Sequence, residues 1–123
     1  MSIRNDISWH VELSIRQGAL AEFSALSAEM VDGTRSGAGV LIYERFISAD
    51  GQTVHVLERY VDSAAAVAHL RVFIDRFGAR FSRLVARNRF EVFGEPSAEL
   101  KEILDRFGAT YSARLTGFAV TAS

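Results

Sequence analysis

The order in which two hydrophobic periodicities alternate along the chain constrains its fold more than any other feature. Apolar and polar residues alternate with a period of two over residues 7–15, and β-branched and aromatic residues crowd residues 40–47 and 53–61, as in strands. Apolar residues recur every three or four positions over residues 19–31 and 62–86, as in amphipathic helices. A last strand is predicted over residues 89–93. The βαββαβ order predicts an α+β, ferredoxin-like fold, in which one antiparallel sheet carries helices on one face.

Turn residues separate these predicted elements. Asp50-Gly51 lies between the second and third strands and favours a hairpin, while Gly78 is expected to break the second helical stretch. Residues 7–94 form the predicted core. Residues 95–123 form a C-terminal extension, with a helix that begins near Pro96 and a strand or arm over residues 110–120. A chain of 123 residues suits a single domain, which we place over residues 1–123.

Composition limits the classes of function. Cysteine is absent, which excludes a disulfide scaffold, a thiolate metal site and a cysteine nucleophile. The net charge of −1 argues against general nucleic-acid binding. No N-terminal secretion signal and no apolar run of membrane-spanning length is visible, so we expect no membrane partner. These features together favour a cytoplasmic location.

The segment over residues 58–69 joins a strand to a helix. Asp62 or Ser63 can accept a hydrogen bond from a free amide of the first helical turn, and the alanines that follow favour a helix. Helical spacing places His69 beside an apolar stripe that includes Phe73. An imidazole in that position is either a packed structural group or a residue of a functional site.

Three short motifs together resemble the antibiotic biosynthesis monooxygenase (ABM) family of dimeric α/β barrels. They are Arg16-Gln17-Gly18 with Phe23, Gly39-Val40-Leu41-Ile42-Tyr43-Glu44, and Glu58-Arg59-Tyr60-Val61-Asp62-Ser63 with Ala66 and His69. The resemblance covers about residues 7–94. It implies a homodimer whose sheets face each other, consistent with apolar residues on both faces of the second and third strands. The family includes cofactor-independent monooxygenases that oxidise aromatic polyketides and quinols, haem-degrading relatives, and members without a known role.

The resemblance transfers only some of the family's residues. His69 matches the helix histidine that many members share, and Trp9 and Tyr43 match aromatic residues on strands. Many members have a second histidine followed by phenylalanine, whereas this chain has Arg71-Val72-Phe73. The haem-degrading members use an asparagine on the first strand, and residues 7–15 contain none. This departure counts against haem degradation.

The chemistry of such an oxygenase suggests roles for particular residues. The protein must bind a flat phenol, take or hold its proton, and exclude water. We predict His69 as the proton-transfer group. Tyr43 or Arg59 would stabilise the phenolate, and Trp9 with Phe73 and Phe77 would form apolar walls. The phenylalanines also suit an ordinary core, and Arg59 also suits an ion pair with Glu58.

A metal site is the remaining alternative for the strand residues. His10, Glu12 and His55 lie on strands that neighbour each other in the predicted topology, and two histidines with one carboxylate would resemble a facial iron triad. The sequence does not fix whether His55 shares the face of His10. We expect no metal and no cofactor.

The sequence therefore predicts a cofactor-independent monooxygenase that acts on a small aromatic substrate, a phenol, quinol or polyketide-like molecule. The alternative is a non-catalytic ligand-binding or stress-related protein of the same fold. The expected partners are a second copy of the chain and a small aromatic ligand, without nucleic acid or membrane.

Overall fold

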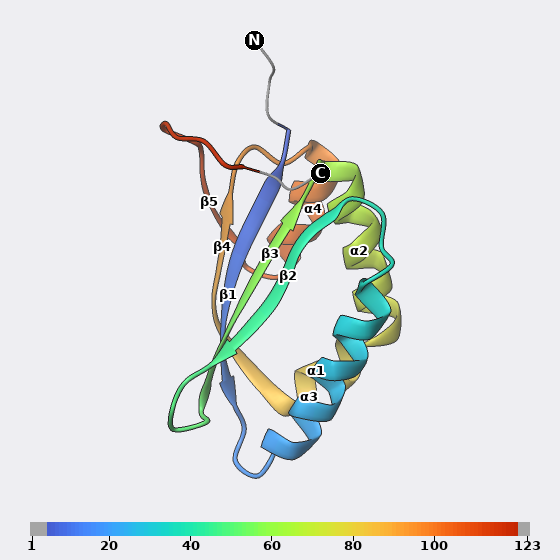
Figure 1. Cartoon of the computed structure of the whole chain (residues 1–123), viewed down its shortest axis with the longest axis vertical. Coiled ribbons are helices and arrows are strands. Elements are labelled where there is room, and N and C mark those ends of the chain that lie inside the picture. Colours follow the sequence, from blue (N-terminus) through green and yellow to red (C-terminus); the bar gives the residue numbers. More distant parts are fainter. Residues whose placement is uncertain (1–4, 121–123) are drawn as a thin grey trace.

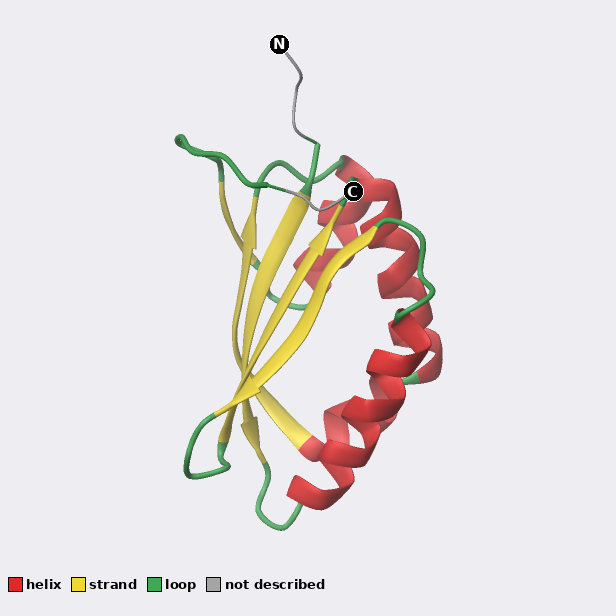
Figure 2. Ribbon diagram, viewed as in Figure 1, coloured by secondary structure: helices red, strands yellow, loops and turns green. Residues whose placement is uncertain are grey.

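The computed structural model describes residues 5–120 and consists of one open sheet with helices on one side. Its elements follow the order β1 (Ile7–Ile15), α1 (Leu20–Thr34), β2 (Val40–Ile47), β3 (Thr53–Tyr60), α2 (Ser63–Arg76), α3 (Gly78–Leu84), β4 (Val85–Phe93), α4 (Ala98–Arg106) and β5 (Thr110–Ser112). The strand order across the sheet is β2-β3-β1-β4-β5. Figures 1 and 2 show the helices on one face of the sheet and the other face bare. The predicted α+β, ferredoxin-like fold is confirmed.

The register of the sheet fixes which side chains face the helices. β1 pairs antiparallel with β3, with Trp9 opposite Glu58, and with β4, with Trp9 opposite Val92. Alternate residues of β1 are buried, from Ile7 at 1% exposure to Leu13 at 0%. The residues between them point to the bare face, as the period of two predicts. This alternation places every site residue on a known face.

The helices cover the buried face with apolar stripes. The buried side chains of α1 and α2 are Phe23, Leu26, Met30, Ala66, Val67 and Leu70, with Thr34 as the buried polar residue at the end of α1. α2 ends at Arg76, and Gly78 begins α3 after the single residue Phe77. The predicted break of the long helical stretch at this glycine is confirmed.

The start of α2 is held in place by two local features. Asp62 accepts a hydrogen bond from the Ala65 amide at 2.9 Å, which caps the helix as predicted. Gly39 lies against the same turn at a φ of +79°, and a Cβ there would lie 2.7 Å from the Ala65 Cβ and 2.8 Å from Val61 Cγ2. Only glycine combines that φ with that close approach. The position of α2, and so of His69, depends on this junction.

The last strand of the core is longer than predicted. β4 begins at Val85, so the prediction of a helix to about residue 86 and a strand from residue 89 was wrong at this boundary. Val85 and Ala86 pair with Ile15 and Ser14, and a register shift between Glu12 and Leu13 accommodates the longer pairing. Tertiary pairing overrode the local helical pattern.

The C-terminal extension is partly packed and partly exposed. Leu100, Ile103 and Leu104 of α4 are buried, and Ser97 caps the helix through the Leu100 amide at 3.2 Å. β5 pairs with β4 in parallel, so the sheet is not wholly antiparallel. Beyond β5 the chain has no further regular element up to residue 120, and Leu115 is 95% exposed. The predicted strand or arm over residues 110–120 is therefore a three-residue strand followed by an arm.

A search of residues 5–120 finds no helix with the length and apolar character needed to cross a membrane.

Candidate functional site

A small cavity lies between the buried face of the sheet and the helices α2 and α3. Its volume is about 40 Å³. Its lining residues come from four strands, two helices and the C-terminal extension; they are Trp9, Val11, Tyr43, Arg45, Val56, Glu58, His69, Leu70, Phe73, Phe81, Arg87, Phe90 and Phe107. Polar groups gather on one part of this lining and aromatic rings on another.

The polar part is built around a carboxylate on β3. Glu58 is only 9% exposed because its position in the strand alternation points to the helices. The Tyr60 hydroxyl donates a 2.5 Å hydrogen bond to Glu58 Oε1, and His69 Nε2 lies 3.5 Å from the same oxygen. Burial and the carboxylate raise the pKa of Tyr60 strongly, which keeps its hydroxyl protonated as a donor. The cluster therefore holds a fixed buried acceptor beside the imidazole.

His69 projects from α2 between two tyrosine rings. The ring centroids of Tyr43 and Tyr60 each lie 5.2 Å from the imidazole centroid. Burial lowers the pKa of His69 below its usual value, Glu58 opposes that shift, and Arg45 adds to it. A histidine with a lowered pKa is neutral near pH 7. His69 therefore presents a neutral imidazole to the cavity.

Tyr43 and Arg45 supply the hydrogen-bond donors of the cavity. Both lie on β2 and point to the helices. Arg45 Nη2 donates to the Tyr43 hydroxyl at 2.9 Å, and the guanidinium lies 5.1 Å from the Tyr43 ring centroid. Burial raises the pKa of Tyr43 to about 12, with Glu58 adding to the shift and Arg45 opposing it. Tyr43 therefore stays protonated and can donate to an anionic oxygen.

Aromatic rings form the other wall. Trp9 packs on Phe90 at 5.7 Å between centroids, Phe73 meets Phe81 edge-on at 5.3 Å, and Phe107 stacks on Phe90 at 6.0 Å. Such a wall excludes water and suits a flat aromatic ligand. Phe107 follows α4, so the C-terminal extension completes this wall.

The cavity is too small for an aromatic ring as it stands. A volume of about 40 Å³ holds only a few water molecules. A larger hollow of about 310 Å³ lies outside it and shares Phe73, Phe81, Arg87 and Phe107 with it. These four side chains line both hollows.

The structure brings together four of the six site residues that the sequence suggested. His69, Trp9, Tyr43 and Phe73 all line the cavity. Phe77 does not; it is a buried core residue whose ring lies 5.0 Å from the Arg76 guanidinium and 5.7 Å from that of Arg80.

Arg59 also lies away from the cavity. Strand alternation points it to the bare face, opposite to its neighbours Glu58 and Tyr60, and its Nε lies 3.5 Å from Asp6 Oδ2. The ion pair with Glu58 that the sequence allowed is replaced by one with Asp6. We leave Arg59 and Phe77 out of the candidate site.

The sequence reasoning missed the three charged residues of the cavity lining, Arg45, Glu58 and Arg87. The signal was present in the strand pattern. Glu58 occupies a position of the buried series that includes Val54 and Val56, and Arg45 lies two residues after Tyr43. A charge in the buried series of a strand indicates a buried polar cluster.

His10 and His55 share the bare face of the sheet. His10 Nε2 and His55 Nδ1 are 2.8 Å apart, and their rings stack at 5.1 Å. Burial lowers the pKa of His10, and His55 lowers it further. In the part of the chain that the structure describes, no three histidine, cysteine or acidic side chains are grouped to hold a metal ion. The two imidazoles therefore hydrogen-bond to each other and do not form the metal-binding triad with Glu12.

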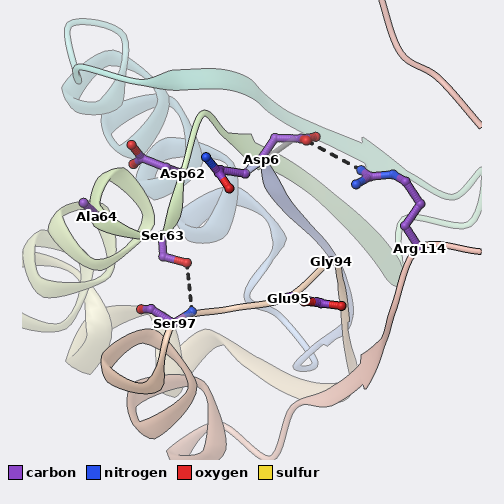
Figure 3. A pocket seen from close by; sticks show the side chains of 9 residues that line it. Asp6, Asp62, Ser63, Ala64, Gly94, Glu95, Ser97 and Arg114 are labelled. Atoms are coloured by element: carbon purple, nitrogen blue, oxygen red, sulfur yellow. Dashed lines mark hydrogen bonds and ion pairs between the residues drawn. The ribbon is translucent and has the colours of Figure 1, made fainter. Parts of the chain in front are cut away.

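A second, more open hollow lies where α2 and α4 begin. Figure 3 shows its polar lining, with the Ser97 amide bonded to the Ser63 hydroxyl at 3.0 Å and Arg114 paired with Asp6 at 3.6 Å. Its volume is about 580 Å³, but its lining has no aromatic ring and no histidine. The smaller cavity at His69 is the better candidate site, because it alone of the two combines an imidazole with a buried carboxylate and an aromatic wall.

Comparison with protein families supports the fold. The sequence pattern of the family described as antibiotic biosynthesis monooxygenase matches residues 7–72, which include β1, β2, β3 and His69. Comparison with curated proteins finds no match.

Several solved structures share the fold. MupZ from Pseudomonas fluorescens is 23% identical, with a TM-score of 0.80, covering 94% of this chain and 95% of its own. Rv0793 from Mycobacterium tuberculosis is 23% identical, with a TM-score of 0.62 and coverage of 76% and 97%. SnoaB from Streptomyces nogalater, described as a cofactor-independent oxygenase, is 14% identical, with a TM-score of 0.63 and coverage of 76% and 96%. The higher coverage of this chain by MupZ means that the likeness extends over more of its length.

Proposed function

Because the chain belongs to the antibiotic biosynthesis monooxygenase family, we propose that it is a cofactor-independent monooxygenase of a small aromatic substrate, and that His69 takes the substrate's proton. The observation that carries the proposal is a neutral, buried imidazole in a cavity with an aromatic wall. The likeness to SnoaB, described as a cofactor-independent oxygenase, agrees with it. The substrate class is a phenol, a quinol or a polyketide-like ring system bearing such a hydroxyl.

The proposed reaction begins with proton transfer from a phenol hydroxyl to His69. The phenolate then passes one electron to dioxygen, which gives an aryloxyl radical and superoxide. These combine to form a carbon–oxygen bond at a ring carbon, and the terminal oxygen of the resulting peroxide takes the proton back from His69. Loss of the ring C–H proton with cleavage of the O–O bond releases water and leaves a second carbonyl. Overall, one phenol and one dioxygen are converted to one quinone and one water.

The cavity supports the early steps of this reaction. Removing a phenolic proton by a positioned base contributes about 10² to 10⁴ in rate. The aromatic wall keeps bulk water from the anion and from the radical pair. The cavity must widen to hold a ring, and the side chains that we expect to move are those it shares with the outer hollow, Phe73, Phe81, Arg87 and Phe107.

We also propose that the protein acts as a homodimer whose sheets face each other. Helices cover one face only, and the bare face carries large apolar side chains, including Phe46 at 50% exposure, Leu57 at 38% and Phe93 at 44%. Apolar residues on an uncovered face favour association. A second copy would bury them and close the two open sheets into a barrel.

A second candidate function is ligand binding without turnover. The inner volume of about 40 Å³ favours it, because a cavity that stays this small would hold a small ligand but would not admit an aromatic substrate. Both candidates use the same cavity and differ in whether dioxygen is consumed.

Oxygen uptake against a panel of naphthols and hydroquinones, with and without a chelator, tests the proposal. We expect uptake that the chelator does not affect and that falls by about 10² to 10⁴ in His69→Ala, with unfolding measured beside the rate. A folded His69→Ala protein with full activity would end the role of His69. Binding of the panel without oxygen uptake would favour the second candidate.

A further inference from the structure

Arg45 is a partly buried cation that makes few strong hydrogen bonds. Its terminal nitrogens contact Met30 Sδ at 3.6 and 3.7 Å, and a thioether is a weak acceptor. Its one strong acceptor is the Tyr43 hydroxyl, which is itself uncharged. Its Nε is buried without a hydrogen-bond partner among residues 5–120.

No carboxylate compensates this cation directly. In the described part of the chain Arg45 forms no ion pair, although Arg59, Arg71 and Arg80 each have an acidic partner. Glu58 is the acidic residue of the cavity, and its Oε1 is occupied by the Tyr60 hydroxyl and faces His69. A partly buried guanidinium with a buried, unpaired Nε and no paired anion is suited to bind an anion.

The arrangement of charges fits the products of a proton transfer. Moving a proton from a phenol to His69 creates an imidazolium and a phenolate. The imidazolium forms 3.5 Å from Glu58 Oε1, and a phenolate bound in the cavity would meet Arg45 and the Tyr43 hydroxyl. Each new charge then appears beside an opposite charge or a donor that is already in place, which is how preorganised sites stabilise an ionised state.

We infer that Arg45, with Tyr43, binds the anionic oxygen of the ionised substrate, so that the protein selects phenols over neutral aromatic molecules of the same shape. This inference rests on the proposed function and names an additional catalytic residue for it. His69 removes the proton, and Arg45 holds the oxygen that it leaves.

Binding of 4-nitrophenol tests the inference without any turnover, because its phenol and phenolate forms absorb at different wavelengths. Its methyl ether, 4-nitroanisole, has the same ring and nitro group but no proton to lose. The variants are Arg45→Gln, which removes the charge, and Arg45→Lys, which keeps it. Arg59→Gln is the matched control, because Arg59 lies on the adjacent strand and points to the opposite face.

The wild-type protein and Arg59→Gln should bind 4-nitrophenol as the phenolate, with an apparent pKa at least about one unit below that of the free dye, the shift expected of a nearby positive charge. Arg45→Gln should lose this shift and bind the dye about tenfold more weakly, with a smaller change for 4-nitroanisole. Arg45→Lys should restore the shift in part. Circular dichroism establishes that each variant is folded.

Several outcomes would overturn the inference. They are an unshifted dye in the wild-type protein, no binding of 4-nitrophenol at all, or equal behaviour of Arg45→Gln and Arg59→Gln. The proposed function fails separately. Phenolate binding that depends on Arg45, without oxygen uptake from any phenol, would support the anion site and reject the oxygenase. Oxygen uptake that is unchanged in Arg45→Gln would support the oxygenase and reject the anion site.

Discussion

Replacing Tyr60 by phenylalanine tests whether the Glu58 cluster is a desolvated, charged site. The substitution keeps the ring, which is fully buried and packs 5.0 Å from the Trp9 ring, and removes only the hydroxyl. Glu58 then loses the donor that lies 2.5 Å from its Oε1. A hydrogen bond to a buried charged group contributes about 1.5 to 3 kcal/mol, and its loss leaves a poorly solvated carboxylate. We expect the free energy of unfolding to fall by about that amount.

Urea denaturation at pH 7 measures this loss, and the chain contains a matched control. The Tyr111 hydroxyl also donates to a carboxylate, Asp105 Oδ1, at 2.6 Å, but this pair is exposed to solvent. Tyr111→Phe removes the same kind of bond where water can replace it, so we expect a distinctly smaller loss. Equal losses in the two variants would refute the reasoning, because they would mean that burial does not strengthen the Tyr60–Glu58 bond.

Four further predictions follow from the geometry. The pKa of His69 is lowered in the folded state, so the unfolded chain binds more protons near and below about pH 6.5, and the free energy of unfolding decreases as the pH falls through that range. His69→Gln should flatten this part of a stability–pH curve measured by urea denaturation. Leu57→Asp should give a monomer by light scattering, whereas a dimer would contradict the proposed interface. Truncation after Gly94 removes the buried α4 and should lower the melting temperature, and truncation after Ser112 should lower it less. Gly39→Ala should destabilise by at least about 1 kcal/mol, the usual cost of a left-handed backbone, and unchanged unfolding would contradict the close approach to α2.

The sequence determined the architecture because its periodicities are strong. The alternation of β1 and the helical stripes of α1 and α2 each permit one register with a buried face, and the helix stop at Gly78 follows from local chemistry. The β4 boundary could not be predicted, because Val85 and Ala86 extend the strand through pairing with β1. The parallel pairing of β5 depends likewise on a contact far away in sequence.

The candidate site was predictable in part, because the same periodicities indicate which side chains face the helices. His69, Trp9 and Tyr43 were found by type and position, but Arg59 was named as the cation and Arg45 was missed. Residues adjacent along a strand point to opposite faces, so Arg59 could not accompany Glu58 into the cavity. Phe107 could not be assigned to the wall from the sequence, since its place depends on how α4 packs against α2.

The ionisation of His69 with and without bound 4-nitrophenol tests the proton-transfer role most directly. Nuclear magnetic resonance can follow the His69 ring, with its signal assigned among the three histidines by its absence in His69→Gln. We predict a pKa below about 6.5 in the free protein and a protonated ring at pH 7 once the phenolate is bound, with no such change for 4-nitroanisole. A His69 that titrates at or above the ordinary value when free, or that ignores bound 4-nitrophenol, would contradict its role as the proton acceptor.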